Sequence, residues 1–104
     1  MADTRSSHAA VVVEEHVQFS FEDLCSACGA DPSTLQALIE EGLLQPRGSG
    51  PAEWHFEGGA LSRALMALRL ARDLRLSADA TVLVVDLLEE IGTLRARLHR
   101  AGLI

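Results

Sequence analysis

The chain of 104 residues contains no lysine and no tyrosine. Because lysine is absent, its nine permanently positive side chains are all arginines. Fifteen acidic residues outweigh them and give a formal net charge of −6 at pH 7. No apolar run approaches the roughly 18 residues that a membrane-spanning helix needs, and the stretch 9–13 is too short for the apolar core of an export signal. We therefore expect one cytoplasmic domain with a modest core.

Signatures of catalysis are missing as well. The sequence has no G-x-S-x-G, no glycine-rich loop that could hold a phosphate and no H-E-x-x-H. Two pairs of adjacent acids, Glu40-Glu41 and Glu89-Glu90, are unsuited to acid–base catalysis, because neighbours on a helix point about 100° apart. We expect a protein that is not an enzyme and that needs no cofactor.

Cysteine is scarce, and its two copies form the motif Cys25-x-x-Cys28. Such a pair can be redox-active or half of a zinc site. Zinc requires four ligands, the four histidines lack metal-ligand spacing, and the βαβ context of a thioredoxin-like motif is absent. Both thiols share a helical stripe with Phe21 and Leu24, so we expect them to pack in the core, with no metal and no disulfide.

Two short helices with a tight connection are predicted next. Ser20 and Asp23 resemble a capping box that starts a first helix, and Gly29 ends it. The Asp-Pro pair at 31–32 starts a second helix, which ends at Gly42. Their apolar positions recur with helical spacing: Phe21, Leu24, Cys25 and Cys28, then Leu35, Leu38 and Ile39. The spacing of about three residues between the helices is that of a helix-turn-helix.

A small sheet is predicted beside these helices. Residues 13–21 alternate between apolar and polar, and "AEWHF" follows the turn cluster "GSGP". Two strands near 15–19 and 53–56 would pack Trp54 and Phe56 over the helices, as in a winged helix. The alternative for Trp54 is a partly exposed binding anchor.

Two more helices complete the predicted order, a first over 60–75 with an Arg69–Asp73 pair and a second from Ser77 to about Arg100. The second helix has a two-heptad apolar seam: Val84, Leu87, Ile91, Leu94 and Leu98. This seam either packs on the helix 61–74 or joins a second copy, and we favour a homodimer. The predicted division is a disordered tail (1–12), a winged helix-turn-helix domain (13–76) and a C-terminal helix (77–104).

Charge is distributed unevenly. Residues 17–60 hold one cation, Arg47, against seven acids, whereas residues 61–104 carry a net charge of +2. "STLQALIEEGLL", in the place of a DNA-reading helix, contains no arginine, lysine or tyrosine. Affinity for nucleic acid rests largely on cations that neutralise phosphates, so this segment would repel DNA.

In this order and spacing, "FEDLC", "GLLQPR", "EWHF", "ALRLARDLRLS" and "LLEEIGTLRARL" resemble the N-terminal winged helix-turn-helix of MerR-type regulators, and most of all the chaperone-modulator family CbpM. The resemblance covers roughly residues 15–98. It implies a mostly α MerR-like fold with a two-strand wing sheet and a C-terminal helix. It also implies a protein that binds the J-domain of a DnaJ-like co-chaperone and inhibits it.

The acidic surface agrees with that implication. MerR-type readers resemble "RTLRYYE", where this chain has "STLQALIE". A J-domain typically presents a basic helix beside its His-Pro-Asp loop, and an acidic face would complement it. The acids expected to contact it are Glu22, Asp23, Glu40, Glu41, Glu89 and Glu90. The alternative for each is an ordinary solvated side chain.

Two other functions remain open. A MerR-like DNA-binding transcription regulator could bind phosphates through Arg63, Arg69, Arg72 and Arg75 if they lie exposed beside the second helix, and its affinity would fall steeply with salt. A general oligomerisation adaptor would self-associate without either partner.

Overall fold

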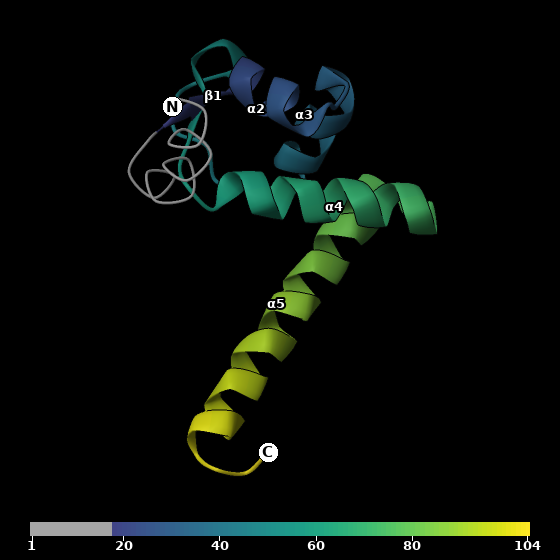
Figure 1. Ribbon diagram of the computed structural model, residues 1–104. Coiled ribbons are helices and arrows are strands. Elements are labelled where there is room, and N and C mark those ends of the chain that lie inside the picture. The colour runs from purple at the N-terminus through teal and green to yellow at the C-terminus, as the bar shows by residue number, and fades with distance from the viewer. Residues whose placement is uncertain (1–17) are drawn as a thin grey trace, which may run out of the picture.

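The computed structural model describes residues 18–104 and is mostly helical, with one two-stranded sheet (Figure 1). The elements are β1 (Phe19–Ser20), α2 (Phe21–Cys28), α3 (Pro32–Glu40), the short 3-10 helix η1 (Pro51–Glu53), β2 (His55–Phe56), α4 (Ala60–Leu74) and α5 (Ala78–Arg100). The predicted fold class is confirmed. The predicted tail, and most of the first predicted strand, lie outside the described residues.

The ends of α2 and α3 follow the predicted caps. The Ser20 hydroxyl accepts a hydrogen bond from the backbone N–H of Asp23 at 3.0 Å, and the Asp23 carboxylate accepts one from Ser20 N–H at 3.4 Å. Gly29 ends α2 in the left-handed conformation with φ of 62°. The Asp31 carboxylate accepts a hydrogen bond from Thr34 N–H at 3.3 Å. Local chemistry thus sets the limits of both helices.

The second strand of the wing sheet is shorter than predicted. Phe19 pairs with Phe56 and Ser20 with His55 in an antiparallel ladder, which a bridge between Arg47 and His55 extends. Residues 51–53 form η1 instead of the start of a strand, because the chain folds back on itself tightly. Gly48 makes this turn possible: its φ is +111°, and an added Cβ would lie 2.3 Å from the Glu53 carbonyl oxygen.

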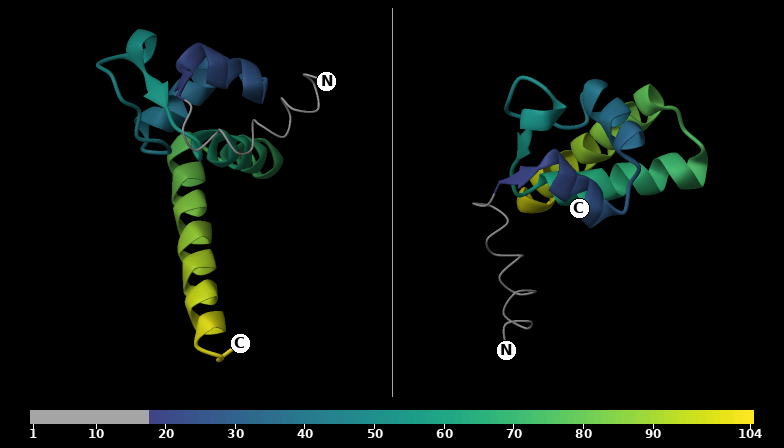
Figure 2. Two further views of the ribbon diagram at one scale, coloured as in Figure 1. Left: turned by 60° about the vertical axis from the view of Figure 1, so that its left-hand side comes forward. Right: turned by 90° about the horizontal axis from the view of Figure 1, so that it is seen from above.

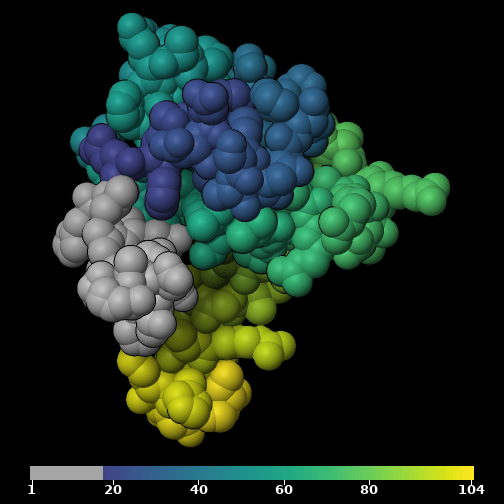
Figure 3. All heavy atoms as spheres, turned by 45° about the horizontal axis from the view of Figure 1, so that its top comes forward, coloured from purple at the N-terminus to yellow at the C-terminus, as the bar shows by residue number. Residues whose placement is uncertain are grey.

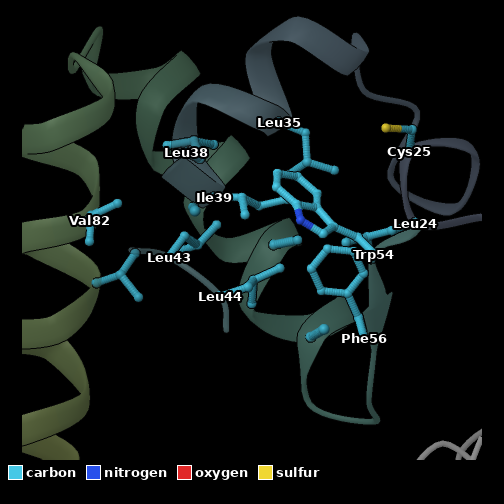
Figure 4. Packing of buried hydrophobic residues seen from close by; sticks show 14 residues of the cluster. Leu24, Cys25, Leu35, Leu38, Ile39, Leu43, Leu44, Trp54, Phe56 and Val82 are labelled. Atoms are coloured by element: carbon cyan, nitrogen blue, oxygen red, sulfur yellow. The ribbon is translucent and has the colours of Figure 1, made fainter. Parts of the chain in front are cut away.

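Trp54 is a core residue, as expected, with 9% of its surface exposed. Its ring meets Phe21 and Phe56 in edge-to-face contacts with centroid distances of 5.4 and 6.1 Å. Figure 4 shows Phe56 beside the indole ring of Trp54. Leu35 and Leu38 of α3 are buried in the same cluster, so the wing and the two short helices share one core.

α4 lies beneath these helices, and α5 extends from its far end (Figure 2). Arg75 turns the chain in the left-handed conformation, and the Ser77 hydroxyl caps α5 through the backbone N–H of Ala80. Only the first turns of α5 contribute to the core, through Val82 and Val85. From residue 86 onwards its side chains are exposed. Its last turns lie away from α4 in Figure 1 and form the lower end of the molecule in Figure 3.

Candidate partner-binding surfaces

Arg63 links three parts of the domain. Its Nε donates to the backbone carbonyl of Leu43 at 2.6 Å, and its Nη2 contacts the Asp86 carboxylate at 2.8 Å. Nη1 is paired with Glu89. The Arg63 side chain is only 20% exposed, whereas the two acids are half exposed. One side chain of α4 therefore joins the loop after α3 to the middle of α5.

This position removes Arg63 from the predicted phosphate-binding stripe. Burial lowers the pKa of the guanidinium, but its hydrogen bonds with Glu89 and Asp86 outweigh that effect and leave the pKa above its ordinary value. Arg69 and Arg75 are exposed. The predicted Arg69–Asp73 pair was wrong, because Asp73 contacts the Nε of Arg72, at 3.0 Å.

The acids of α2 lie at its first turn, where the positive end of the helix dipole stabilises them. Glu22 and Asp23 are both exposed. Asp23 also belongs to the capping box, so its carboxylate has a structural role. Glu22 borders a shallow hollow of about 510 Å³ together with Phe21 and Cys25.

The acids at the end of α3 are placed differently. Glu40 is the last residue of the helix, and Glu41 is its C-cap. Both are exposed, and α3 has no basic residue in its last turn. Carboxylates at the negative end of a helix dipole are destabilising. Glu40 accepts a hydrogen bond from the Gln36 amide at 3.0 Å, and neither acid joins an ion pair within residues 18–104.

The two predicted acids of α5 are not equivalent. Glu89 is already held by Arg63, whereas Glu90 is exposed and takes part in no ion pair among the residues that the structure describes. Glu89 and Arg63 line an open groove of about 590 Å³ whose other side includes Gly42 and Leu43. The groove thus begins directly after Glu41 and brings the end of α3 towards α5, while Glu22 of α2 borders another hollow.

The apolar seam of α5 is mostly uncovered. Leu87, Ile91, Leu94 and Leu98 are 53%, 47%, 45% and 40% exposed, and Val84 is half-buried. α5 packs on the domain through another face, formed by Thr81, Val82 and Val85. From Leu87 onwards, packing against α4 therefore does not account for the seam.

The two cysteines are free thiols in the α2 stripe, Cys25 buried and Cys28 half-buried. Burial is the largest cause that raises the pKa of each; the charges of Asp31 and Glu22 add to it for Cys25, and Cys25 adds to it for Cys28. Among residues 18–104, no group of three or more His, Cys, Asp or Glu side chains could hold a metal ion.

Comparison with known families agrees with this architecture. The model of the MerR HTH family regulatory protein matches residues 19–101, which is most of the chain. The chain therefore belongs to the MerR helix-turn-helix family.

Within that family, two similar proteins have the same name. A chaperone modulatory protein CbpM from Coxiella burnetii (strain Dugway 5J108-111) is 28% identical over 89 residues, which is 86% of this chain and 84% of that protein. A protein of the same name from Pseudomonas entomophila (strain L48) is 30% identical over 80 residues, 77% of this chain and 79% of that protein. This chain is a member of the CbpM group of chaperone modulators.

These matches agree with the expected absence of catalysis, because proteins of the MerR helix-turn-helix and CbpM families are not enzymes. No helix within the described part of the chain has the length and hydropathy to cross a membrane.

Proposed function

We propose that this chain is a cytoplasmic modulator that binds the J-domain of a DnaJ-like co-chaperone and inhibits it. The observation that carries the proposal is the pair of carboxylates at the end of α3, Glu40 and Glu41. They lie in a segment of net negative charge, on the helix whose Ser33 and Gln36 stand where MerR-type readers carry arginine.

The position of this pair favours a cationic partner. Exposed carboxylates at the negative end of α3 reduce the stability of the free protein, and a basic helix placed beside them would reverse that effect. The neighbouring groove, which the half-buried Met66 lines, supplies apolar surface for the same partner. Charge would thus speed the encounter, and the apolar groove would add affinity.

Of the remaining acids, Glu22 and Glu90 are free to contribute to a negative field around this surface, because both are exposed. Asp23 and Glu89 make local contacts with Ser20 and Arg63. We assign these two a secondary role in J-domain binding.

Calorimetry of the full chain against the J-domain of a DnaJ-like co-chaperone, at two salt concentrations, tests the proposal. We expect saturable binding that weakens with salt, and the variant E40Q/E41Q should bind at least about fivefold more weakly at low salt. The matched control is E53Q/D73N, which removes two exposed carboxylates that do not line the groove.

An equal loss of J-domain affinity in both variants would mean that the affinity depends only on the net charge of the chain and that the end of α3 is not the binding site. No binding at either salt would refute the J-domain proposal. Binding of duplex DNA in place of the J-domain would support the transcription-regulator alternative.

We also propose a homodimer that forms through the seam of α5. Four large apolar side chains that stay 40–53% exposed on one helix face are typical of a surface that another helix covers. Light scattering over a range of concentrations tests this proposal, and a monomer mass at every concentration would refute it.

A further inference from the structure

α5 is buried against the domain only at its first turns. Its buried residues are Thr81, Val82 and Val85, and from residue 86 onwards every side chain is exposed. Beyond this point α5 diverges from α4 and extends away from the domain (Figure 1). At 1.5 Å per residue, 86–100 form a rod of about 21 Å, so a rotation of about 15° at its base would move its far end by about 5 Å. The direction of α5 therefore depends on the contacts made close to residue 86.

Arg63 makes those contacts. Asp86 and Glu89 continue the buried face of Val82 and Val85, because the four residues follow one another at helical spacing. Asp86 contacts Nη2 of the Arg63 guanidinium at 2.8 Å, and Glu89 is paired with Nη1. Among the ion pairs found within residues 18–104, these two alone join 86–100 to another element.

A guanidinium is suited to fixing the direction of a helix. Its nitrogen atoms lie in one plane with fixed geometry, so two carboxylates one turn apart on α5 can both meet it only over a narrow range of helix directions. Half-exposed ion pairs of this kind contribute little to the free energy of unfolding. Their effect on direction is separate, because the apolar contacts of Val82 and Val85 are not directional.

The same arginine is connected to the end of α3. The backbone N–H of Leu43 donates to the Leu38 carbonyl at 3.0 Å, and the Leu43 carbonyl accepts from Arg63 Nε at 2.6 Å. Leu38 belongs to the last turn of α3, and Glu41 is the C-cap of that helix. Two hydrogen bonds thus link the end of α3 with the side chain that contacts α5.

We infer that Arg63 is a positioning residue that sets the direction of α5, and that a cationic partner in the groove loosens this arrangement by competing for Glu89. Glu89 lines the groove that begins after Glu41, so a basic side chain bound there would lie close to the same carboxylate. Asp86 would then be the remaining contact of the guanidinium, and one contact restricts the helix less than two. This coupling rests on the J-domain binding proposed above, whereas the positioning role concerns the free chain.

The variant D86A/E89A tests the positioning role. It removes both carboxylates, keeps the hydrogen bond between Arg63 and Leu43, and places a good helix former at two exposed positions. The matched control is D73A/E90A, which also removes two exposed carboxylates from α4 and α5. Neither of these contacts Arg63, since Asp73 is paired with Arg72 and Glu90 has no ion pair among the described residues.

Residual dipolar couplings of the backbone N–H groups measure the direction of residues 86–94 relative to α4. One alignment tensor should fit both segments in the unchanged chain and in D73A/E90A. D86A/E89A should require two tensors whose magnitudes differ at least about 1.4-fold, as a flexible segment differs from a rigid one. Both copies of a symmetric dimer give the same couplings, so the result does not depend on whether α5 pairs with a second copy.

Circular dichroism measures the helix content of each variant. A single tensor for D86A/E89A at unchanged helix content would overturn the positioning role. R63K keeps the charge without the planar fork, so it should also require two tensors. If D86A/E89A lost helix content, a single tensor for R63K would overturn the positioning role in its place.

Saturation with the J-domain of a DnaJ-like co-chaperone tests the coupling. In the saturated unchanged chain, residues 86–94 should need a tensor of their own, as they do in free D86A/E89A, and the J-domain should leave the two tensors of that variant unchanged. One shared tensor in the saturated unchanged chain would overturn the coupling. If calorimetry showed no J-domain binding, the proposed function and the coupling would both be refuted, while the couplings of the free chain would still decide the role of Arg63.

Discussion

Replacement of Arg63 by alanine is the most informative perturbation of this fold, because one side chain holds the loop after α3 and the middle of α5 together. Leu43 is only 1% exposed, and its carbonyl oxygen accepts from Arg63 Nε at 2.6 Å. A buried acceptor without its donor costs about 1–3 kcal/mol. The variant R63A should therefore be clearly destabilised by this contact alone.

The ion pairs add less, because solvent screens them. Asp86 and Glu89 are about half exposed, and such pairs contribute roughly 0.2–1 kcal/mol each. Together with the buried stem of the arginine, we expect R63A to lose about 2–4 kcal/mol of unfolding free energy. For a domain of this size that corresponds to a fall in Tm of roughly 10–20 °C.

Thermal unfolding followed by circular dichroism measures this loss, at one fixed protein concentration because dimerisation would shift Tm. R69A is the matched control, since Arg69 lies exposed on the same helix. The free energy of unfolding of R69A should stay within about 0.5 kcal/mol of that of the unchanged chain. R63K keeps the charge but loses the planar fork, so it should recover only part of the stability. If R63A had the same Tm as R69A, Arg63 would not be the link between α4 and α5.

Three further predictions concern local chemistry. E40Q/E41Q should raise Tm by about 2–6 °C at low salt, as two charges leave the negative end of α3; an unchanged or lower Tm would contradict this. A hydrogen bond from the Ser33 hydroxyl, and another from Thr34 N–H, lower the pKa of Asp31. The Asp31 carboxylate therefore stabilises the fold above about pH 4, and this stabilisation is lost as pH falls through the pKa of the folded state. D31N keeps a cap and should flatten Tm against pH in that acid range; parallel curves would exclude this role. Cys25 and Cys28, whose pKa values are raised, should react with iodoacetamide at pH 7 much more slowly than in urea, and equal rates would show that burial does not protect them.

The parts of this fold that the sequence predicts well are set by neighbouring residues. The capping box of Ser20 and Asp23 and the left-handed stop at Gly29 need only a few residues of context, and all are confirmed. The buried position of Trp54 follows from the same local reading, because the wing must cover an apolar stripe.

Contacts between residues that are far apart in the sequence could not be predicted from such local patterns. Arg63 and Asp86 are 23 residues apart, and no periodicity distinguishes Arg63 from the exposed arginines of α4. The second wing strand is also shorter than predicted, because the turn at Gly48 brings the chain back against Glu53. The candidate acids were predicted as one set, but Asp23 and Glu89 have intramolecular partners that depend on the folded chain.

The exposed end of α5 also determines how long that helix persists. From residue 86 to Arg100 every side chain is exposed, so few tertiary contacts oppose fraying of these turns in a single copy. Amide hydrogen exchange should therefore be fast there and slow around Val82 and Val85, which lie in the core. The molecule that covers Leu87 to Leu98 also determines how long these turns stay folded. With a second copy in that place, the cellular concentration of this chain controls how much of α5 is folded.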